Sequence, residues 1–202
     1  MADPTSPALR LFVAVLPPPE VLDGLEEFLA PHRAAWPDLR WLRRDVLHVT
    51  LAFLGEVDER TLDRLVPRLE RAAGRHARLR LSFAGGGAFP GGGAHARVLW
   101  TGLYGDRRTL AGLAASAAAA AVRAGAPQDK YRGFRPHMTL ARCRRPTDVR
   151  PLVEELSAFA GTPWTAGSIH LMRSHLGRQV RYESVRSWPL RRDPDLASDR
   201  GE

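Results

Sequence analysis

The 202-residue chain contains a single cysteine and no long run of apolar residues. One cysteine cannot form an internal disulfide, and Cys143, between two arginines, lacks the neighbours of a catalytic thiol, so we interpret it as structural. No stretch approaches the roughly 18 consecutive apolar residues that a membrane-spanning helix needs. The N-terminus also lacks the basic region and apolar segment of a secretory signal. We therefore expect a cytoplasmic protein that does not contact a membrane.

Lysine is nearly absent as well. The 30 lysine and arginine residues are almost all arginine, and they outnumber the 22 acidic residues to give a formal net charge of +8. The planar guanidinium suits two-pronged contact with phosphate, and the positive excess favours an anionic partner. A GC-rich genome also favours arginine over lysine, so charge alone does not identify nucleic acid as that partner.

The length fits one domain or two tightly joined lobes, and a hydrophobic content of 44% is enough to form a core. We expect residues 8–190 to form a single bilobal domain that acts as a monomer. The polar, proline-bearing ends, 1–7 and 191–202, are predicted to be disordered.

Apolar patterns and turn signals predict interleaved strands and helices. The expected strands lie at residues 9–16, 45–54, 77–84, 96–103, 136–142, 165–174 and 181–187, and the expected helices at 20–32, 59–74, 106–125 and 148–159. Asp58 offers an N-cap for the second helix. The glycine-rich stretch 85–93 is predicted to be a flexible hairpin turn, because a strand and not a helix follows it. Adjacent strand pairs indicate an α+β fold with mostly antiparallel sheets.

The pattern His-x-Thr-Leu-Ala occurs twice, at residues 48–52 and 137–141. Side chains alternate between the two faces of a strand, so each histidine shares a face with the threonine two positions later, while the apolar residues point the other way. If the two strands belong to two similar lobes, a pseudo-twofold relation would bring both polar pairs to a common groove.

Two facing imidazoles suit the hydrolysis of a strained cyclic phosphodiester. One neutral histidine can take a proton from water while one protonated histidine gives a proton to the leaving ribose oxygen. Both states are accessible near neutrality because the ordinary histidine pKa is about 6.5. The hydroxyls of Thr50 and Thr139 can donate to nonbridging phosphate oxygens. This scheme requires no metal and no other cofactor.

Structural alternatives exist for the same residues. A single histidine in a strand is more often a hydrogen-bonded structural residue than a catalyst, but two copies with the same neighbours favour a shared site. A zinc site is the main chemical alternative, although zinc takes three or four ligands at characteristic spacings that this sequence does not show. The other histidines lack such a repeat and are assigned to surface or packing roles: His32, His76, His95, His170 and His175.

Five segments together resemble the two-histidine phosphoesterase superfamily, specifically the bacterial and archaeal RNA 2′,3′-cyclic phosphodiesterases once called 2′-5′ RNA ligases. They are RLFVAVLPP, HVTLAFLGEV, AGGGAFPGGGAHARVLW, FRPHMTLARC and SHLGRQVRYESVRSWPL, and the resemblance spans residues 9–190. In the last segment, relatives often have a glycine between the positions of Gly177 and Tyr182, where this chain has Arg-Gln-Val.

The resemblance implies two pseudo-symmetric lobes, each an antiparallel sheet with helices, that flank a central groove. It also implies roles for three residues. His48 would protonate the O3′ leaving group, His137 would accept a proton from water, and Arg142 would contact the phosphate, leaving an RNA 2′-phosphate end.

Three functions are compatible with these patterns. The first is hydrolysis of RNA 2′,3′-cyclic phosphate ends, and the second is action on a small cyclic nucleotide or an ADP-ribose cyclic phosphate. The third is RNA binding without catalysis, which has no use for two titrating histidines at matched positions. The basic charge favours RNA ends over a small nucleotide, which offers few phosphates to neutralise.

Overall fold

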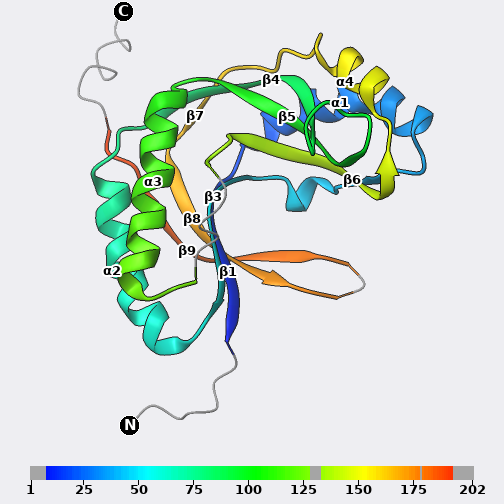
Figure 1. Ribbon diagram of the computed structural model, residues 1–202. Helices are drawn as coiled ribbons and strands as arrows, with labels where there is room; N and C mark the ends of the chain where they lie inside the picture. The colour runs from blue at the N-terminus through cyan, green and yellow to red at the C-terminus, as the bar shows by residue number, and fades with distance from the viewer. Residues whose placement is uncertain (1–7, 128–132, 178, 193–202) are drawn as a thin grey trace, which may run out of the picture.

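The computed structural model describes residues 8–127, 133–177 and 179–192. Within them, strands and helices interleave along the chain (Figure 1). The strands are β1 (Leu9–Val15), β2 (Arg40–Trp41), β3 (Val49–Val57), β4 (Leu79–Phe89), β5 (Ala96–Gly105), β6 (His137–Thr147), β7 (Trp164–Ala166), β8 (Ser168–His175) and β9 (Arg181–Pro189). The α-helices are α1 (Pro19–Ala35), α2 (Glu59–Gly74), α3 (Arg107–Ala124) and α4 (Arg150–Leu156), and a 3₁₀ turn spans Arg44–Val46.

The strands form one curled antiparallel sheet in the order β7-β4-β5-β6-β3-β1-β8-β9, with β2 beside β6. Its two central strands, β3 and β6, pair at a single position, Val49 with Met138. The sheet therefore consists of two half-sheets, β9-β8-β1-β3 and β6-β5-β4-β7, which meet at the strands that carry the repeated motif. The predicted α+β class with antiparallel sheets is confirmed.

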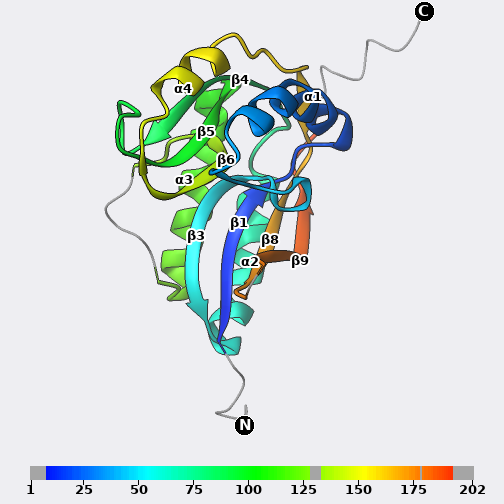
Figure 2. The same ribbon diagram turned by 90° about the vertical axis from the view of Figure 1, so that its right-hand side faces the viewer.

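The helices cover the two half-sheets separately. Helices α2 and α3 pack side by side on the half that contains β3, whereas α1 and α4 lie together over the other half (Figures 1 and 2). Phe28 of α1 contacts Phe159, which follows α4, with ring centroids 4.8 Å apart. No helix within the described residues is long and apolar enough to cross a membrane.

Residues at the helix ends predicted the bounds of α2 and the end of α3. Helix α2 has the predicted bounds, and the carboxylate of Asp58 accepts a hydrogen bond from the backbone N–H of Thr61 at 2.7 Å. The helix continues through Pro67. Helix α3 ends before Gly125, whose φ of 87° is the left-handed conformation that glycine adopts most easily. Helix α4, predicted at 148–159, is shorter at both ends and spans Arg150–Leu156.

The glycine-rich stretch 85–93 is not a turn throughout. The first three glycines lie inside β4, and only the glycines at 91–93 belong to the turn before β5. Close packing explains this difference: a Cβ atom at Gly87 would lie 2.2 Å from Cζ2 of Trp100 on the paired strand. Glycine is therefore used here to admit an indole ring and not to make a turn.

Two predicted strands also needed correction. The predicted strand 45–54 begins later, at Val49, because residues 44–46 form the 3₁₀ turn, and His48 immediately precedes β3. The predicted strand 165–174 is divided at Gly167 into β7 and β8. Strand β7 pairs with β4 and β8 pairs with β1, so the chain changes half-sheets at this glycine.

Arg191, which falls within the tail predicted to be disordered at 191–202, is instead hydrogen-bonded to the folded part of the chain. The backbone N–H of Arg191 donates to the carbonyl of His76 at 2.8 Å, and its carbonyl accepts from the N–H of Arg78 at 3.1 Å. The chain is thus anchored beyond residue 190. The rest of the two predicted tails, at 1–7 and 193–202, lies outside the described residues.

Candidate active site

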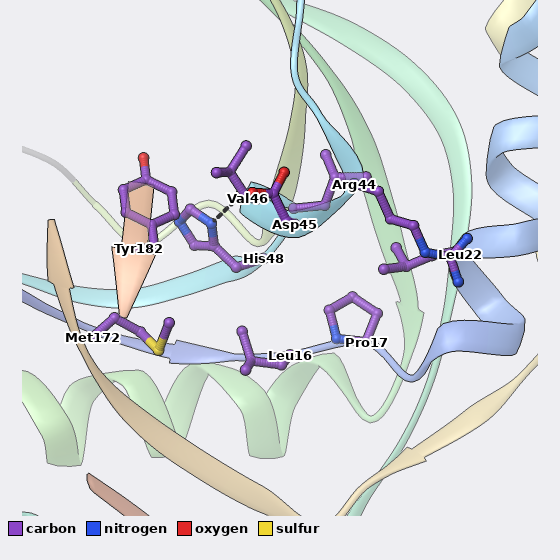
Figure 3. A pocket seen from close by; sticks show the side chains of 10 residues that line it. Leu16, Pro17, Leu22, Arg44, Asp45, Val46, His48, Met172 and Tyr182 are labelled. Atoms are coloured by element: carbon purple, nitrogen blue, oxygen red, sulfur yellow. Dashed lines mark hydrogen bonds between the residues drawn. The ribbon is translucent and has the colours of Figure 1, made fainter. Parts of the chain in front are cut away.

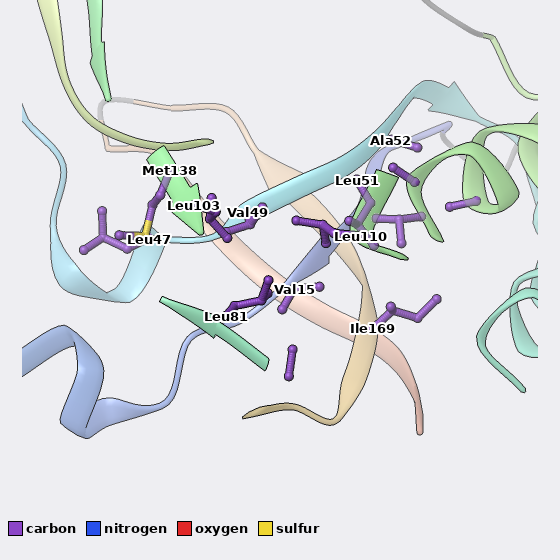
Figure 4. Packing of buried hydrophobic residues seen from close by; sticks show 14 of the residues in the cluster. Val15, Leu47, Val49, Leu51, Ala52, Leu81, Leu103, Leu110, Met138 and Ile169 are labelled. Carbon is purple, nitrogen blue, oxygen red and sulfur yellow. The ribbon is translucent and has the colours of Figure 1, made fainter. Parts of the chain in front are cut away.

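The register of the two central strands places the repeated motifs side by side. Because β3 and β6 are antiparallel and Val49 faces Met138, His48 falls opposite Thr139 and Thr50 falls opposite His137. The four polar residues are half-buried, whereas the apolar residues between them are buried. Figure 4 shows Val49, Leu51 and Met138 within the hydrophobic core. Both polar pairs therefore occupy the face of the sheet that points away from this core.

Both imidazoles are oriented by the same local hydrogen bond. Nδ1 of His48 lies 2.8 Å from the carbonyl oxygen of Val46, and Nδ1 of His137 lies 2.6 Å from that of Arg135 (Figure 3 shows the first). A carbonyl oxygen only accepts, so Nδ1 must carry a proton in each ring. Nε2 is therefore the acceptor of each neutral imidazole, and it is the nitrogen that can take up or release a proton.

Each imidazole also contacts two aromatic rings. The ring of His48 lies 4.8 Å from Phe12 and 5.1 Å from the edge-on ring of Tyr182, between centroids. The ring of His137 lies 5.0 Å from the edge-on ring of Phe89 and 6.1 Å from Trp100. These contacts restrict how far either imidazole can turn. Sequence reasoning missed all four aromatic residues, because they come from different strands and share no spacing with the histidines.

Both histidines favour the neutral state in the free protein. Burial lowers the pKa of His48 to about 4, and the nearby charges of His137 and Arg142 act in the same direction, whereas the bond to Val46 opposes them. Burial also lowers the pKa of His137, and Arg142 adds to this effect. A bound anionic phosphate would favour the protonated forms and raise both pKa values.

Arg142 belongs to the same face because β6 contains a β-bulge. The consecutive residues Leu99 and Trp100 of β5 face Ala141 and Thr139, so Leu140 is an extra residue on β6. Strict alternation would place Arg142 on the buried side with Met138. The bulge reverses this alternation, and the exposed Arg142 lies on the side of the two motifs, near enough to influence both histidines.

The other central strand has the same irregularity. Val13 and Ala14 of β1 face Ala52 and Thr50, so Leu51 is the extra residue on β3. The position equivalent to Arg142 is then Phe53, whose side chain is 61% exposed. The two halves thus repeat the histidine, the threonine and the bulge, but they differ in the residue that follows.

Four of the five remaining histidines have local partners. His32 pairs with Glu155 at 2.9 Å and His175 with Glu183 at 2.8 Å. His76 is hydrogen-bonded to Ser116, and His170 is hydrogen-bonded to Ser168. Within residues 8–127, 133–177 and 179–192, no three His, Cys, Asp or Glu side chains gather closely enough to hold a metal ion. Cys143 is buried, and burial raises the pKa of its thiol.

The family model described as the 2′-5′ RNA ligase superfamily matches residues 17–178, which include both motifs. This chain belongs to that superfamily. The resemblance inferred from the repeated motif is therefore confirmed. Phe12 and Tyr182, the aromatic neighbours of His48, lie outside the matched residues.

Individual members of the superfamily support the same assignment. The RNA 2′,3′-cyclic phosphodiesterase of Escherichia coli (strain K12) is 30% identical over 185 residues, which cover 90% of this chain and 96% of the relative. The protein of the same name from Geobacillus stearothermophilus is 27% identical over 191 residues, and these cover 94% of this chain but only 60% of the relative. The crystal structure of E. coli LigT in apo form has a TM-score of 0.75 and 27% identity, covering 92% of this chain and 99% of that one.

Proposed function

We propose that this superfamily member hydrolyses the 2′,3′-cyclic phosphate ends of RNA to 2′-phosphate ends, with His48 and His137 as the acid–base pair. The observation that carries the proposal is the placement of two His-Thr pairs opposite each other on β3 and β6. Both imidazoles have Nδ1 bound to a carbonyl, which leaves Nε2 for proton transfer. The names of the curated relatives support the same activity class.

In the proposed reaction, Nε2 of His137 takes a proton from a water molecule as the water oxygen bonds to phosphorus. The bond from phosphorus to O3′ breaks, and Nε2 of His48 gives its proton to O3′. The product has a free 3′-hydroxyl and a 2′-phosphate, and proton exchange with solvent restores both histidines. The hydroxyls of Thr50 and Thr139 and the guanidinium of Arg142 stabilise charge on the nonbridging oxygens. The order of acid and base follows the superfamily resemblance.

The basic composition supports RNA ends over a small cyclic nucleotide as the substrate, since a longer chain offers more phosphates to neutralise. We further propose that residues 8–190 act as one bilobal unit, because each half supplies one histidine. The monomeric state and the cytoplasmic location expected from the sequence stay predictions.

The direct test is incubation with an oligoribonucleotide that bears a 2′,3′-cyclic end, in the presence of EDTA. We expect complete conversion to the 2′-phosphate, because imidazole protons and hydroxyl or guanidinium donors perform the chemistry. The position of the product phosphate is determined by ³¹P–¹H correlation NMR, in which a 2′-phosphate couples to H2′ and a 3′-phosphate couples to H3′. Loss of activity in EDTA with recovery on addition of zinc would refute the metal-independent mechanism.

The pH dependence should report the lowered histidine pKa values. Activity is lost at low pH when both histidines are protonated and at high pH when both are neutral, so kcat/KM follows a bell-shaped curve. Because the pKa of His48 is lowered to about 4 and that of His137 is lowered too, both limbs of kcat/KM should lie below the ordinary histidine pKa. The bound phosphate raises both pKa values, so the limbs of kcat should lie at higher pH. Coincident profiles for kcat and kcat/KM would contradict this explanation.

Replacing Arg142 with lysine should impair the enzyme although the charge is kept. An ammonium group cannot reproduce a planar two-pronged contact, and one charged hydrogen bond contributes roughly 1.5–3 kcal/mol, so we expect kcat/KM to fall about tenfold or more. The matched control is Arg108→Lys on α3, where the arginine is exposed and lies outside the proposed site. If steady-state kinetics gave both variants the kcat/KM of the wild type, Arg142 would not contact the substrate phosphate.

A further inference from the structure

Two arginines face each other directly on the neighbouring strands β2 and β6. Arg40 of β2 is paired with Arg142 of β6. The adjacent pair, Trp41 with Ala141, packs in or against the hydrophobic core. Directly opposed residues of an antiparallel pair point to the same face of the sheet, and successive residues alternate between faces. Both arginines are exposed, and both therefore point to the face that carries the two motifs.

This arrangement of charge is unfavourable for the protein without a ligand. Like charges that lie directly opposite each other destabilise a strand pair. The ion pairs within the described residues involve other arginines, namely Arg33, Arg43, Arg44 and Arg150. In that part of the chain, Arg40 and Arg142 are thus two opposed cations without a carboxylate partner. An anion bound beside them would offset their repulsion.

The two arginines differ in their distance from the histidines. The charge of Arg142 lowers the pKa of both His48 and His137, whereas Arg40 is not among the charges that shift either pKa. The strand pairing agrees with this difference, because β3 lies beside β6 at Met138 and β2 lies beside β6 further along the strand. One phosphate can therefore lie at the histidines and Arg142, and a second can lie beside Arg40.

An RNA end offers two phosphates on one ribose. The cyclic phosphate is attached to the 2′ and 3′ oxygens, and the 5′ oxygen carries the phosphate that joins the rest of the chain. We propose that Arg40 binds this 5′-phosphate while Arg142 binds the cyclic phosphate. This inference rests on the proposed function. Directly opposed residues have Cβ atoms about 4.5–5.5 Å apart, and two long guanidinium side chains can extend from there to neighbouring phosphates.

A site of this kind distinguishes an RNA end from a free cyclic nucleoside. A nucleoside 2′,3′-cyclic phosphate has no 5′-phosphate, so it leaves the charge of Arg40 uncompensated. An RNA end supplies the anion that this position lacks. Contacts to backbone phosphates carry no sequence information, so the discrimination should be the same whichever base the terminal nucleotide has.

The test compares two substrates that differ only in this phosphate. One is adenosine 2′,3′-cyclic phosphate, and the other is its 5′-(methyl phosphate), in which the methyl ester leaves the single negative charge of an RNA linkage. For the wild type, we expect kcat/KM to be about tenfold or more higher with the 5′-phosphorylated compound, which is the scale of one charged hydrogen bond. Arg40→Gln should reduce this ratio to near one. The ratio corrects for any loss that the variant shows with both compounds.

Arg108→Gln is the matched control, because it removes the same charge from an exposed position on α3 and should keep the wild-type ratio. Thermal unfolding shows that the Arg40→Gln variant is folded. Its melting temperature should equal or exceed that of the wild type, because the substitution removes a like charge that faces Arg142. A wild-type ratio that persists in Arg40→Gln would overturn the assignment of Arg40.

Binding of the two products provides a readout that does not depend on turnover. Calorimetry should show the wild type binding adenosine 2′-phosphate about tenfold more tightly when it carries the 5′-(methyl phosphate), and Arg40→Gln binding both compounds equally. The difference should shrink as the salt concentration rises. Equal kcat/KM for the two cyclic compounds, with equal binding of the two products, would overturn the phosphate site while leaving the hydrolytic function in place. Absence of hydrolysis with a binding difference that depends on Arg40 would instead refute the hydrolytic function and support the site.

Discussion

Replacing His48 or His137 with alanine is expected to lower kcat on an RNA 2′,3′-cyclic end by about a hundredfold or more. This is the usual effect of removing a positioned general acid or base. A backbone carbonyl and two aromatic rings position each imidazole. A buffer or water molecule that replaced the missing imidazole would lack this positioning, so it should restore little of the lost rate. Single-turnover measurements on the cyclic oligonucleotide separate this loss from changes in product release.

The matched control for these variants is His76→Ala. His76 is hydrogen-bonded to Ser116 and lies outside the motifs, so its loss should leave turnover within about twofold of the wild type. Thermal unfolding of each variant shows whether the loss of ring contacts also destabilises the fold. A properly folded His48→Ala or His137→Ala variant with near-normal turnover would remove that histidine from the mechanism.

A substrate with sulfur in place of the leaving O3′ should separate the two roles. A thiolate is a much weaker base than an alkoxide and needs little protonation as it leaves. His48→Ala should therefore recover most of its lost rate on this substrate, on the order of tenfold or more, because general-acid catalysis is the contribution that sulfur makes unnecessary. His137→Ala should stay impaired, because water must still lose a proton.

The comparison is made as the ratio of rates on the sulfur and oxygen substrates for each variant. The wild-type ratio corrects for the intrinsic difference between the two compounds. Rescue of His137→Ala instead of His48→Ala would keep a two-histidine mechanism and reverse the roles. Rescue of neither variant would show that protonation of the leaving group does not limit the reaction.

Local chemistry explains which parts of the fold were predictable. The N-cap at Asp58 and the left-handed Gly125 act within a few residues, so the bounds of α2 and the end of α3 followed from the sequence. Alternation placed the histidine and threonine of each copy on one face, and the meeting of the two copies followed only on the further assumption of two similar lobes. The exact neighbours of each histidine depend on distant strands and were not predictable.

The errors arose where tertiary contacts override local patterns. Gly87 lies in a strand because Trp100 needs the space above it, a requirement that the glycine run itself does not reveal. Gly167 divides an apparently continuous strand because its two parts pair with different half-sheets. Arg142 shows the largest effect of this kind. Strand alternation alone would have placed its side chain on the buried side of the sheet, and the bulge at Leu140 brings it to the face of the histidines.

The strands of one half-sheet, β4 to β7, follow one another in the sequence, but the other half takes β1 and β3 from before this stretch and β8 and β9 from after it. The chain begins with β1 in one half, passes to α1 over the other, returns for β3 and α2, and crosses again several times before β8 and β9 (Figure 1). A chain cut in the turn at 91–93 would yield two fragments, neither with a complete half-sheet and each with one of the two motif histidines. Every such fragment pair would have to reassemble both halves together before the two imidazoles could meet, which makes this fold a natural basis for fragment complementation.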